Sequence, residues 1–301
     1  MNSPQWQGQR PFQEVWYCTF NDATRGYWFR YTLLAQQNKN VLPILKVWAF
    51  IFDPAQKKIF QFQKAFPCQP SHFKEGVVSA GKENIFHPGH LEGNIDQKIQ
   101  WHISYSKNGR AVDLFPAWLK KIPSIKTRFI IPYQDTQFSG SVEIENLKFQ
   151  FKDAPGTQGH IWGNKHAYQW IWGHCNQLNE AGYSFEILAA KPFSFFPFLT
   201  FGYLKTPEKE YFFQAPWKNR IRPFDQDCQF RLIHKEICIT GKIKVDPADQ
   251  VKAIYTNTFG KDFFCYNSEL ASLELNLTKP GAFTHHLSSR HTMHFEFTKH
   301  D

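Results

Sequence analysis

Apolar and polar residues alternate along most of the chain in short runs, which is the pattern of half-buried β-strands. Phenylalanine alternates with Gln and Lys in Ile59–Phe66, and Gly140–Phe151 shows a similar alternation. Aromatic and β-branched runs at Gly26–Ala35 and Pro43–Phe52 predict two further strands. Turn residues separate the runs at regular intervals, and no long amphipathic helix is visible. The pattern therefore predicts an all-β protein built of sandwiches or barrels.

The length of 301 residues is typical of one large or two medium domains. Residues 152–156 form a short polar segment with Pro and Gly, which makes them the best boundary candidate. We therefore expect one β-domain over residues 1–152 and a second over 156–301. We also expect one short helical turn within Leu114–Pro123 and a strand over Phe195–Leu204.

The stretch Gly159–Asn176 concentrates aromatic and hydrogen-bonding residues as no other part of the chain does. Its second half, from Ala167, predicts a strand, in which side chains point alternately to the two faces. The larger, polar-tipped side chains share one face: Tyr168, Trp170, Trp172, His174 and Asn176. The opposite face is small. His160 and Trp162 share a face of their own just before a Gly-Asn turn signal. One face of this strand is thus expected to pack in a core while the other lines a cavity.

Two interpretations of this stretch remain open. It is either a core strand whose Trp and His groups are satisfied internally, or the wall of a site that uses them. Burying His160, His174 and Asn176 without partners would cost roughly 1–3 kcal/mol each. The number of polar groups on one wall favours a functional site.

The net charge is +9, from 35 Lys and Arg against 26 Asp and Glu. A basic protein is suited to nucleic acid or to an anionic membrane. The cationic residues are spread along the chain, however, and we interpret most of them as solvated surface. We expect no nucleic-acid partner and keep peripheral contact with a membrane as an option. The six cysteines are scattered and form no C-x-x-C pair, and the sequence shows no apparent signal peptide and no apolar run long enough to span a membrane. We therefore expect a cytoplasmic protein with reduced thiols.

No nucleotide-binding, serine-hydrolase or zinc-protease motif is present, so no cofactor is expected. His160, His166 and His174 have no carboxylate at close spacing on one face, and no metal is expected either. An aromatic cavity for an apolar ligand fits the residues better. Trp faces stabilise cations such as those formed in a polyene or prenyl chain, and a neighbouring His moves protons.

The run Gly-His160-x-Trp162-Gly, followed by the Trp-rich strand that ends in His174-Cys175-Asn176, resembles the lipocalin-like superfamily of tocopherol cyclases and carotenoid 1,2-hydratases (hydroxyneurosporene synthases). Other stretches are similar to its uncharacterised bacterial branch: Trp16-Tyr17, Gly26–Leu33, Pro116–Lys126, Ser139–Val142 and Phe264–Glu269. The resemblance spans most of the chain. It implies two lipocalin-like antiparallel β-barrel or sandwich domains packed together, with a lipophilic ligand held between or within them.

In the hydratase branch, the His and Trp of His-x-Trp act with a Tyr-x-Asp on a following strand. His160 and Trp162 match the first motif, but His174-Cys175-Asn176 stands where the acid is expected. Glu186, on the next predicted strand, is the nearest replacement. The resemblance thus implies His160, His174 and Glu186 as catalytic candidates.

The ligand-binding candidates are Trp162, Tyr168, Trp170, Trp172 and Asn176. We expect a lipophilic, isoprenoid- or polyene-like small molecule in an aromatic-lined pocket at or near the domain interface. Cyclisation, isomerisation and hydration all remain open as reactions. The alternative is a non-catalytic carrier or sensor of a hydrophobic ligand.

Overall fold

The computed structural model describes residues 2–74, 76–107, 110–122, 125, 127–224, 227–279, 281 and 284–299. Over these residues it consists of antiparallel β-strands and short 3₁₀ helices, which confirms the all-β prediction. None of the helices in the described part of the chain is long and apolar enough to cross a membrane. The chain forms two compact units: unit 1 comprises Met1–Asp113, Lys126–His166 and Thr256–Asp262, and unit 2 comprises Leu114–Ile125, Ala167–Tyr255 and Phe263–Asp301.

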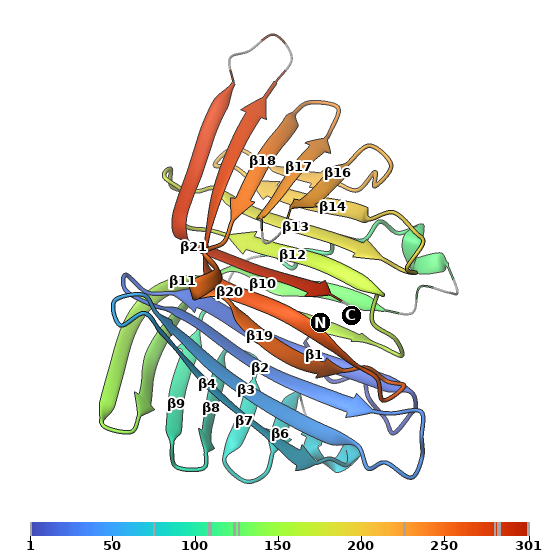
Figure 1. Cartoon of the computed structure of the whole chain (residues 1–301), viewed down its shortest axis with the longest axis vertical. Helices are drawn as coiled ribbons and strands as arrows, with labels where there is room; N and C mark the ends of the chain where they lie inside the picture. Colours follow the sequence, from blue (N-terminus) through green and yellow to red (C-terminus); the bar gives the residue numbers. More distant parts are fainter. Residues whose placement is uncertain are drawn as a thin grey trace. The chain divides into compact units, whose positions relative to one another are not determined.

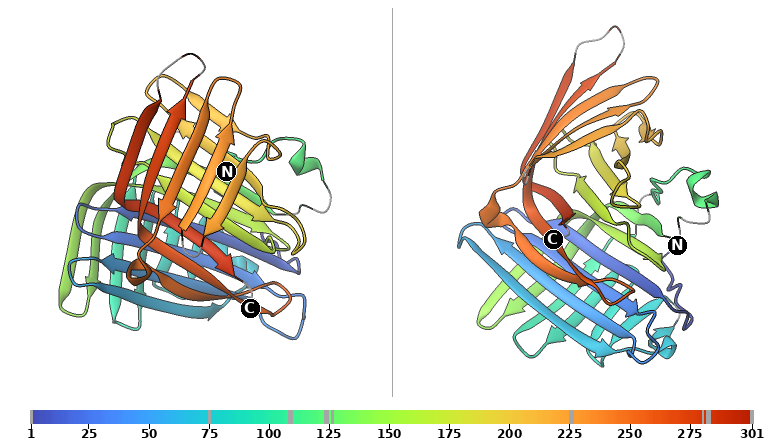
Figure 2. Two further views of the ribbon diagram at one scale, coloured as in Figure 1. Left: turned by 45° about the horizontal axis from the view of Figure 1, so that its top comes forward. Right: turned by 45° about the vertical axis from the view of Figure 1, so that its right-hand side comes forward.

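Unit 1 contains an 11-stranded sheet in the order β4-β3-β2-β1-β11-β10-β9-β8-β7-β6-β5 (Figure 1). The strands are β1 (Phe12–Asn21), β2 (Gly26–Ala35), β3 (Ile44–Asp53), β4 (Lys58–Pro67), β5 (Phe73–Lys74), β6 (Val77–Ala80), β7 (Asn84–His87), β8 (His90–Ile95), β9 (Ile99–Tyr105), β10 (Arg128–Ile144) and β11 (Leu147–Gly163), with helix η1 (Pro70–His72) before β5. The sheet curls into a barrel-like form (Figure 2). As a result, the Tyr31 hydroxyl on β2 reaches the backbone oxygens of Ile85 on β7 and Glu92 on β8, at 3.4 and 3.2 Å.

The core of unit 1 fills the concave face of this sheet with aromatic side chains. Phe20 stacks on Phe138 with ring centroids 4.5 Å apart, and Phe29 packs on Trp101 at 5.3 Å. All four are almost fully buried. Strand β4 shows why alternation predicts the strands so well, because its phenylalanines face this core while most of its Gln and Lys residues are half-buried or exposed.

Unit 2 contains a 10-stranded sheet in the order β15-β14-β13-β12-β21-β20-β18-β17-β16, with β19 paired to β20. Its strands are β12 (Gln169–Cys175), β13 (Ser184–Lys191), β14 (Leu199–Lys205), β15 (Glu210–Phe213), β16 (Arg220–Phe224), β17 (Asp227–Ile233), β18 (Cys238–Lys244), β19 (Val251–Thr256), β20 (Asp262–Thr278) and β21 (His285–Lys299), and its helices are η2 (Leu119–Lys121) and η3 (Pro247–Asp249). Strand β12 lies between β13 and β21, so the last strand of the chain pairs with the first strand of this sheet. The inner face carries Ile171, Phe185, Ile187 and Phe295.

Several sequence-based boundaries differ from the structure. Gly140–Phe151 was expected to be one strand, which is wrong, because β10 ends at Ile144 and β11 begins at Leu147. Glu145 there has a φ of 53°, the left-handed conformation of a tight turn. Strand β14 begins at Leu199 rather than Phe195, while the short helical turn expected near Trp118 is confirmed as η2. Residues 152–156, the expected linker, lie inside β11, and the two units divide the chain elsewhere.

Candidate functional site

The aromatic stretch from Gly159 to Asn176 is divided between the two units. Its first part ends β11 in unit 1, whereas its second part forms β12 in unit 2. The predicted site residues therefore belong to two clusters. The His160 cluster lies in unit 1, and the His174 cluster lies in unit 2.

The His160 cluster is built by the pairing of β1 with β11, which places Trp16 opposite His160 and Glu14 opposite Trp162. The His160 Nε2 and Glu14 Oε1 atoms are 2.8 Å apart, and neither side chain is exposed to solvent. The imidazole also lies between two indoles, with ring centroids 5.1 Å from Trp16 and 4.6 Å from Trp162. His160 is thus held by a carboxylate and two aromatic rings.

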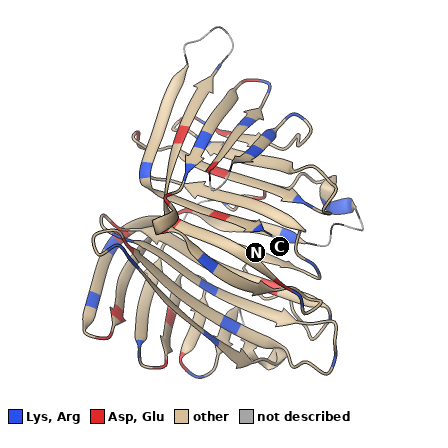
Figure 3. Ribbon diagram, viewed as in Figure 1, with Lys and Arg blue, Asp and Glu red and all other residues tan. Residues whose placement is uncertain are grey.

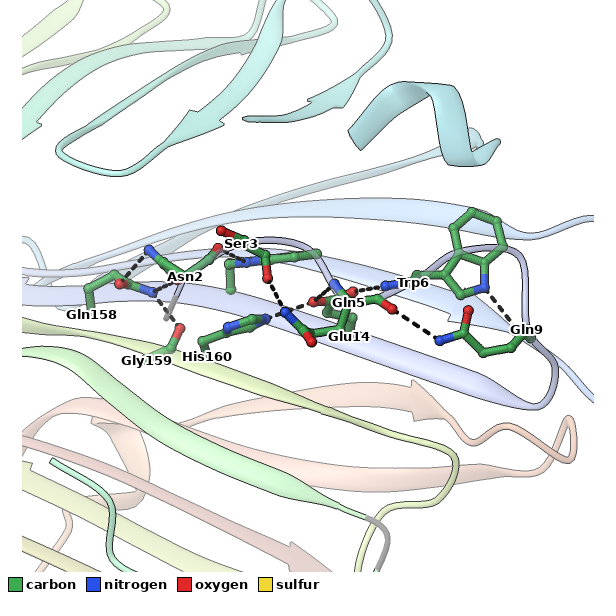
Figure 4. Close-up of polar contacts among 10 residues, drawn as sticks. Asn2, Ser3, Gln5, Trp6, Gln9, Glu14, Gln158, Gly159 and His160 are labelled. Carbon is green, nitrogen blue, oxygen red and sulfur yellow. Dashed lines mark hydrogen bonds and ion pairs between the residues drawn. The ribbon is translucent and has the colours of Figure 1, made fainter. Parts of the chain in front are cut away.

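Glu14 also anchors the first residues of the chain, which we call the N-terminal strap (residues 2–9). Its carboxylate accepts hydrogen bonds from the backbone N–H groups of Gln5, at 2.8 Å, and Trp6, at 3.0 Å. Figure 4 shows these contacts together with the Asn2 side chain, which donates to Gln158 at 2.8 Å. One buried carboxylate therefore links the strap to His160, and the charge-assisted bonds offset the cost of burying it.

The His174 cluster is built by the pairing of β12 with β13, which places His174 directly opposite Glu186. The His174 Nδ1 and Glu186 Oε2 atoms are 2.7 Å apart. The second carboxylate oxygen accepts a hydrogen bond from the Trp172 indole N–H. All three side chains are buried, and burial raises the pKa of Glu186. The structure thus brings together three of the residues that the sequence singled out.

The other ring nitrogen of His174 has no hydrogen-bond partner among the described residues. His174 Nε2 is buried, and no atom within the described residues hydrogen-bonds to it. Leaving a buried polar atom in this state costs about 1–3 kcal/mol, which makes His174 Nε2 a candidate for a ligand contact. A histidine oriented through Nδ1 by a carboxylate presents Nε2 as a proton donor or acceptor.

A second buried His–Glu pair lies beside the first. His294 on β21 is opposite His174, and the two imidazoles stack with centroids 5.6 Å apart. Glu269 on β20 hydrogen-bonds to His294 Nδ1. Burial, followed by the charge of His174, lowers the pKa of His294 well below its usual value. The His294 imidazole is therefore neutral at pH 7.

The surroundings of the His174 cluster are apolar. On the same face of the sheet, Leu188 lies opposite Phe201 in the β13–β14 pair, and both are buried. Phe115 packs edge-on against Phe201 at 5.4 Å. Trp170, also on this face, donates its indole N–H to Glu296. These residues are outside the inner core of unit 2, and so the face is a second apolar surface with a polar centre.

The inner face of β12 borders a cavity of about 260 Å³. Its lining is Gln169, Ile171, Pro223, Asp227, Cys228, Phe295, Phe297 and Lys299. Because side chains alternate along a strand, this cavity is on the side of β12 opposite to Trp172 and His174. Of the two faces of the predicted strand, the smaller one therefore borders the cavity.

Two of the remaining candidates, Tyr168 and Asn176, flank β12. Tyr168 precedes β12 and is 37% exposed, and its backbone N–H donates to the Lys191 oxygen at 2.8 Å. Asn176 directly follows β12 and is half-buried. Trp162 packs beside His160 in unit 1.

Sequence reasoning missed Glu14, His294 and Glu269. A signal existed for Glu14, because a carboxylate on the same strand face as Trp16 and Phe20 interrupts an aromatic stripe. His294 had a similar signal, since it alternates with Phe295 in a strand. Neither pattern identifies its partner, because strand pairing over such distances is not encoded locally.

The pKa of His294 predicts how stability depends on pH. The folded pKa is lowered, so the unfolded chain binds the proton first, and stability falls as pH drops below about 6.5. The expected slope from this group reaches about 1.4 kcal/mol per pH unit. Glu186 has the opposite effect on stability. Its pKa is raised in the folded protein, so its contribution makes stability fall as pH rises above the ordinary pKa of 4.5.

Comparing wild type with His294→Asn isolates the first contribution. Urea unfolding at about pH 7.5 and about pH 5.5 should show a smaller loss of stability in the variant. His286→Asn, at an exposed position of the same strand, should retain the wild-type slope. Equal slopes in all three proteins would contradict a neutral, buried His294.

The chain is similar to known proteins in its fold but not in its sequence. No protein-family model matches it, and no curated protein matches it in sequence. Among solved structures, CghA with Sch210972 has a TM-score of 0.63 at 9% identity, covering 96% of this chain and 88% of that one. A candidate AttH from Nitrosomonas europaea has a TM-score of 0.56 at 12% sequence identity, and the match covers 95% of this chain and 92% of that one. Kievitone hydratase from Nectria haematococca has a TM-score of 0.56 at 10% identity, and the match covers 95% of this chain and 88% of that one. The chain thus shares the fold of these proteins, and the lipocalin-like fold that the sequence resemblance implied is confirmed.

Proposed function

We propose that this protein binds a lipophilic small molecule, isoprenoid- or polyene-like, against the Trp172 face of unit 2, and that His174 transfers a proton to or from it. The single observation that carries the proposal is the buried His174, held through Nδ1 by Glu186 with Nε2 unbonded. Apolar neighbours such as Leu188 and Phe201 suit a ligand with little polarity.

The chemistry suited to this arrangement is proton transfer without a cofactor. In an isomerisation, neutral His174 takes a proton from a carbon of the ligand, and Glu186 stabilises the imidazolium that forms. The same nitrogen returns the proton to another carbon, so atoms and charge balance. In a cyclisation or a hydration, the imidazolium protonates an alkene carbon, and the indole of Trp172 faces the cation that forms. A second alkene of the ligand or a water molecule adds to this cation, and the proton that is then lost returns to His174. His160, which is enclosed by Glu14, Trp16 and Trp162, is not needed for this step.

The structural neighbours support the proposal in a limited way. CghA was solved with Sch210972, and kievitone hydratase is named for a hydration. The first is consistent with a small molecule bound to this fold, and the second with a reaction on one.

The 260 Å³ cavity favours a second candidate function, that of a non-catalytic carrier. Its walls include Ile171, Phe295 and Phe297 but no histidine. A ligand held there would lie across the sheet from His174. The cavity is slightly smaller than the roughly 300 Å³ at which pockets for drug-sized ligands begin, and so it suits only a small ligand.

Neighbouring residues on opposite faces of β12 distinguish the two functions. Native mass spectrometry and solvent extraction of the purified protein should identify a bound lipophile. Trp172→Leu should lower the occupancy by about tenfold or more, because it removes a large apolar contact. Ile171→Trp, which fills the inner cavity, should leave occupancy unchanged.

The reverse pattern, with ligand lost only in Ile171→Trp, would establish the carrier and exclude the catalytic proposal. A wild-type protein that is empty and takes up no lipophile from a cell extract would contradict both. Circular dichroism of each variant checks that it has folded.

A further inference from the structure

Three connecting segments of unit 2 meet at one end of its sheet. They are residues 114–122, the β13–β14 loop at 192–198 and the β15–β16 loop at 214–219. Trp118 and Trp217 pack with ring centroids 5.9 Å apart, which joins the first segment to the third. The Asn219 amide donates to the backbone oxygens of Thr200, at 2.8 Å, and Phe213, at 2.9 Å. The third segment is thereby fixed to the beginning of β14, next to the second.

These segments expose large aromatic side chains. Phe195 is 85% exposed and Trp217 is 61% exposed, while Phe193 and Trp118 are each 42% exposed. Phe193 and Phe195 stack at 5.7 Å. Exposed aromatic groups on neighbouring loops, unlike single exposed leucines, indicate a surface that contacts something apolar.

The charged residues around these aromatic residues are mostly basic. The three segments contain Lys120, Lys121 and Lys218 but no Asp or Glu, and the charged residues directly next to them are Lys191, Arg220 and Asp113. The Arg220 guanidinium donates to the Trp217 backbone oxygen at 2.6 Å, so this cation is held on the third segment. Figure 3 shows the lysines of η2 in blue on the same segment.

We infer that this aromatic–basic surface (Trp118, Phe193, Phe195, Trp217 and the five cations) docks onto a membrane that contains anionic lipid. Indole and phenyl rings partition into the headgroup region of a bilayer. Lysine and arginine next to them bind the phosphates and carboxylates of anionic headgroups. A soluble protein partner would typically offer carboxylates in matched positions, whereas a bilayer satisfies the rings and the cations at once. The inference goes beyond the proposed function and does not depend on it.

Vesicle co-sedimentation tests this inference with the full chain. Wild type should bind vesicles with about 30% phosphatidylserine in phosphatidylcholine, and bind pure phosphatidylcholine more weakly. The double variant Phe195→Ser with Trp217→Ser should lose about tenfold or more in partitioning. Lys121→Glu with Lys218→Glu should remove the preference for anionic vesicles and flatten the dependence on salt.

Phe259→Ser is the matched control, because Phe259 is 53% exposed but lies in a segment of unit 1. It should bind as wild type does. No binding of wild type to anionic vesicles, or an equal loss in the Phe259 control, would overturn the inference. So would concentration-dependent self-association that the double variant abolishes without any vesicle binding, since the surface would then join two copies of this chain. Because all substituted side chains are exposed, the unfolding midpoints should stay near that of wild type.

Discussion

Replacing Glu14 by alanine is expected to destabilise unit 1 by about 3–5 kcal/mol, which is the usual cost of breaking a buried, hydrogen-bonded charge pair. The carboxylate accepts hydrogen bonds from His160 and from the backbone of Gln5 and Trp6, and it is fully buried. Its removal leaves these donors without an acceptor and creates a cavity. Urea unfolding followed by Trp fluorescence measures the loss.

The loss of Glu14 should also loosen the N-terminal strap locally. Without Glu14, the N-terminal strap loses two backbone anchors, and limited proteolysis should cleave within residues 2–9 much faster. Glu14→Gln should be intermediate, because the amide keeps one acceptor oxygen but points an N–H group at other donors. Glu143→Ala, which removes an exposed ion pair with Lys148, should have little effect. An unfolding midpoint of Glu14→Ala equal to that of wild type would show that the strap is not held by this carboxylate.

His174→Gln is expected to lower kcat by about 100- to 10,000-fold on the lipophile identified by extraction, since general acid–base groups contribute this much. Glutamine keeps a hydrogen-bonding group toward Glu186 but has no titratable nitrogen. Because the contacts of the ligand with the Trp172 face are unchanged, KM should change little.

Glu186→Gln tests whether the carboxylate acts through His174. If Glu186 orients the imidazole and stabilises its charge, the single variants and the double variant should have similar rates, because the residues act as a unit. His286→Gln, at an exposed position in the same unit, is the control and should retain wild-type kcat. Full activity in His174→Gln would exclude the catalytic proposal while leaving ligand binding intact.

Alternation predicted much of the strand structure, because successive side chains of a strand point to opposite faces of the sheet. It also predicted correctly that Trp170, Trp172 and His174 share one face, and Glu186 was singled out as the nearest carboxylate. The partners from other strands were not predictable. His294 lies opposite His174 only because β21 pairs with β12, and that pairing joins segments far apart in the sequence. The prediction of one strand over Gly140–Phe151 was wrong for a local reason. Glu145 adopts a left-handed conformation that its residue type does not favour, and the chain turns there.

The position of β21 between β12 and β20 has a consequence for synthesis on the ribosome. Chains fold from the N-terminus as they emerge, and all the strands of the 11-stranded sheet precede β12 in the chain. The sheet of unit 2, by contrast, has a central gap until its last 15-residue strand has been made. Until then β12 and β20 present unpaired edges, which are sites of aggregation. Nonsense mutations near the C-terminus should therefore yield insoluble protein rather than a trimmed but functional one.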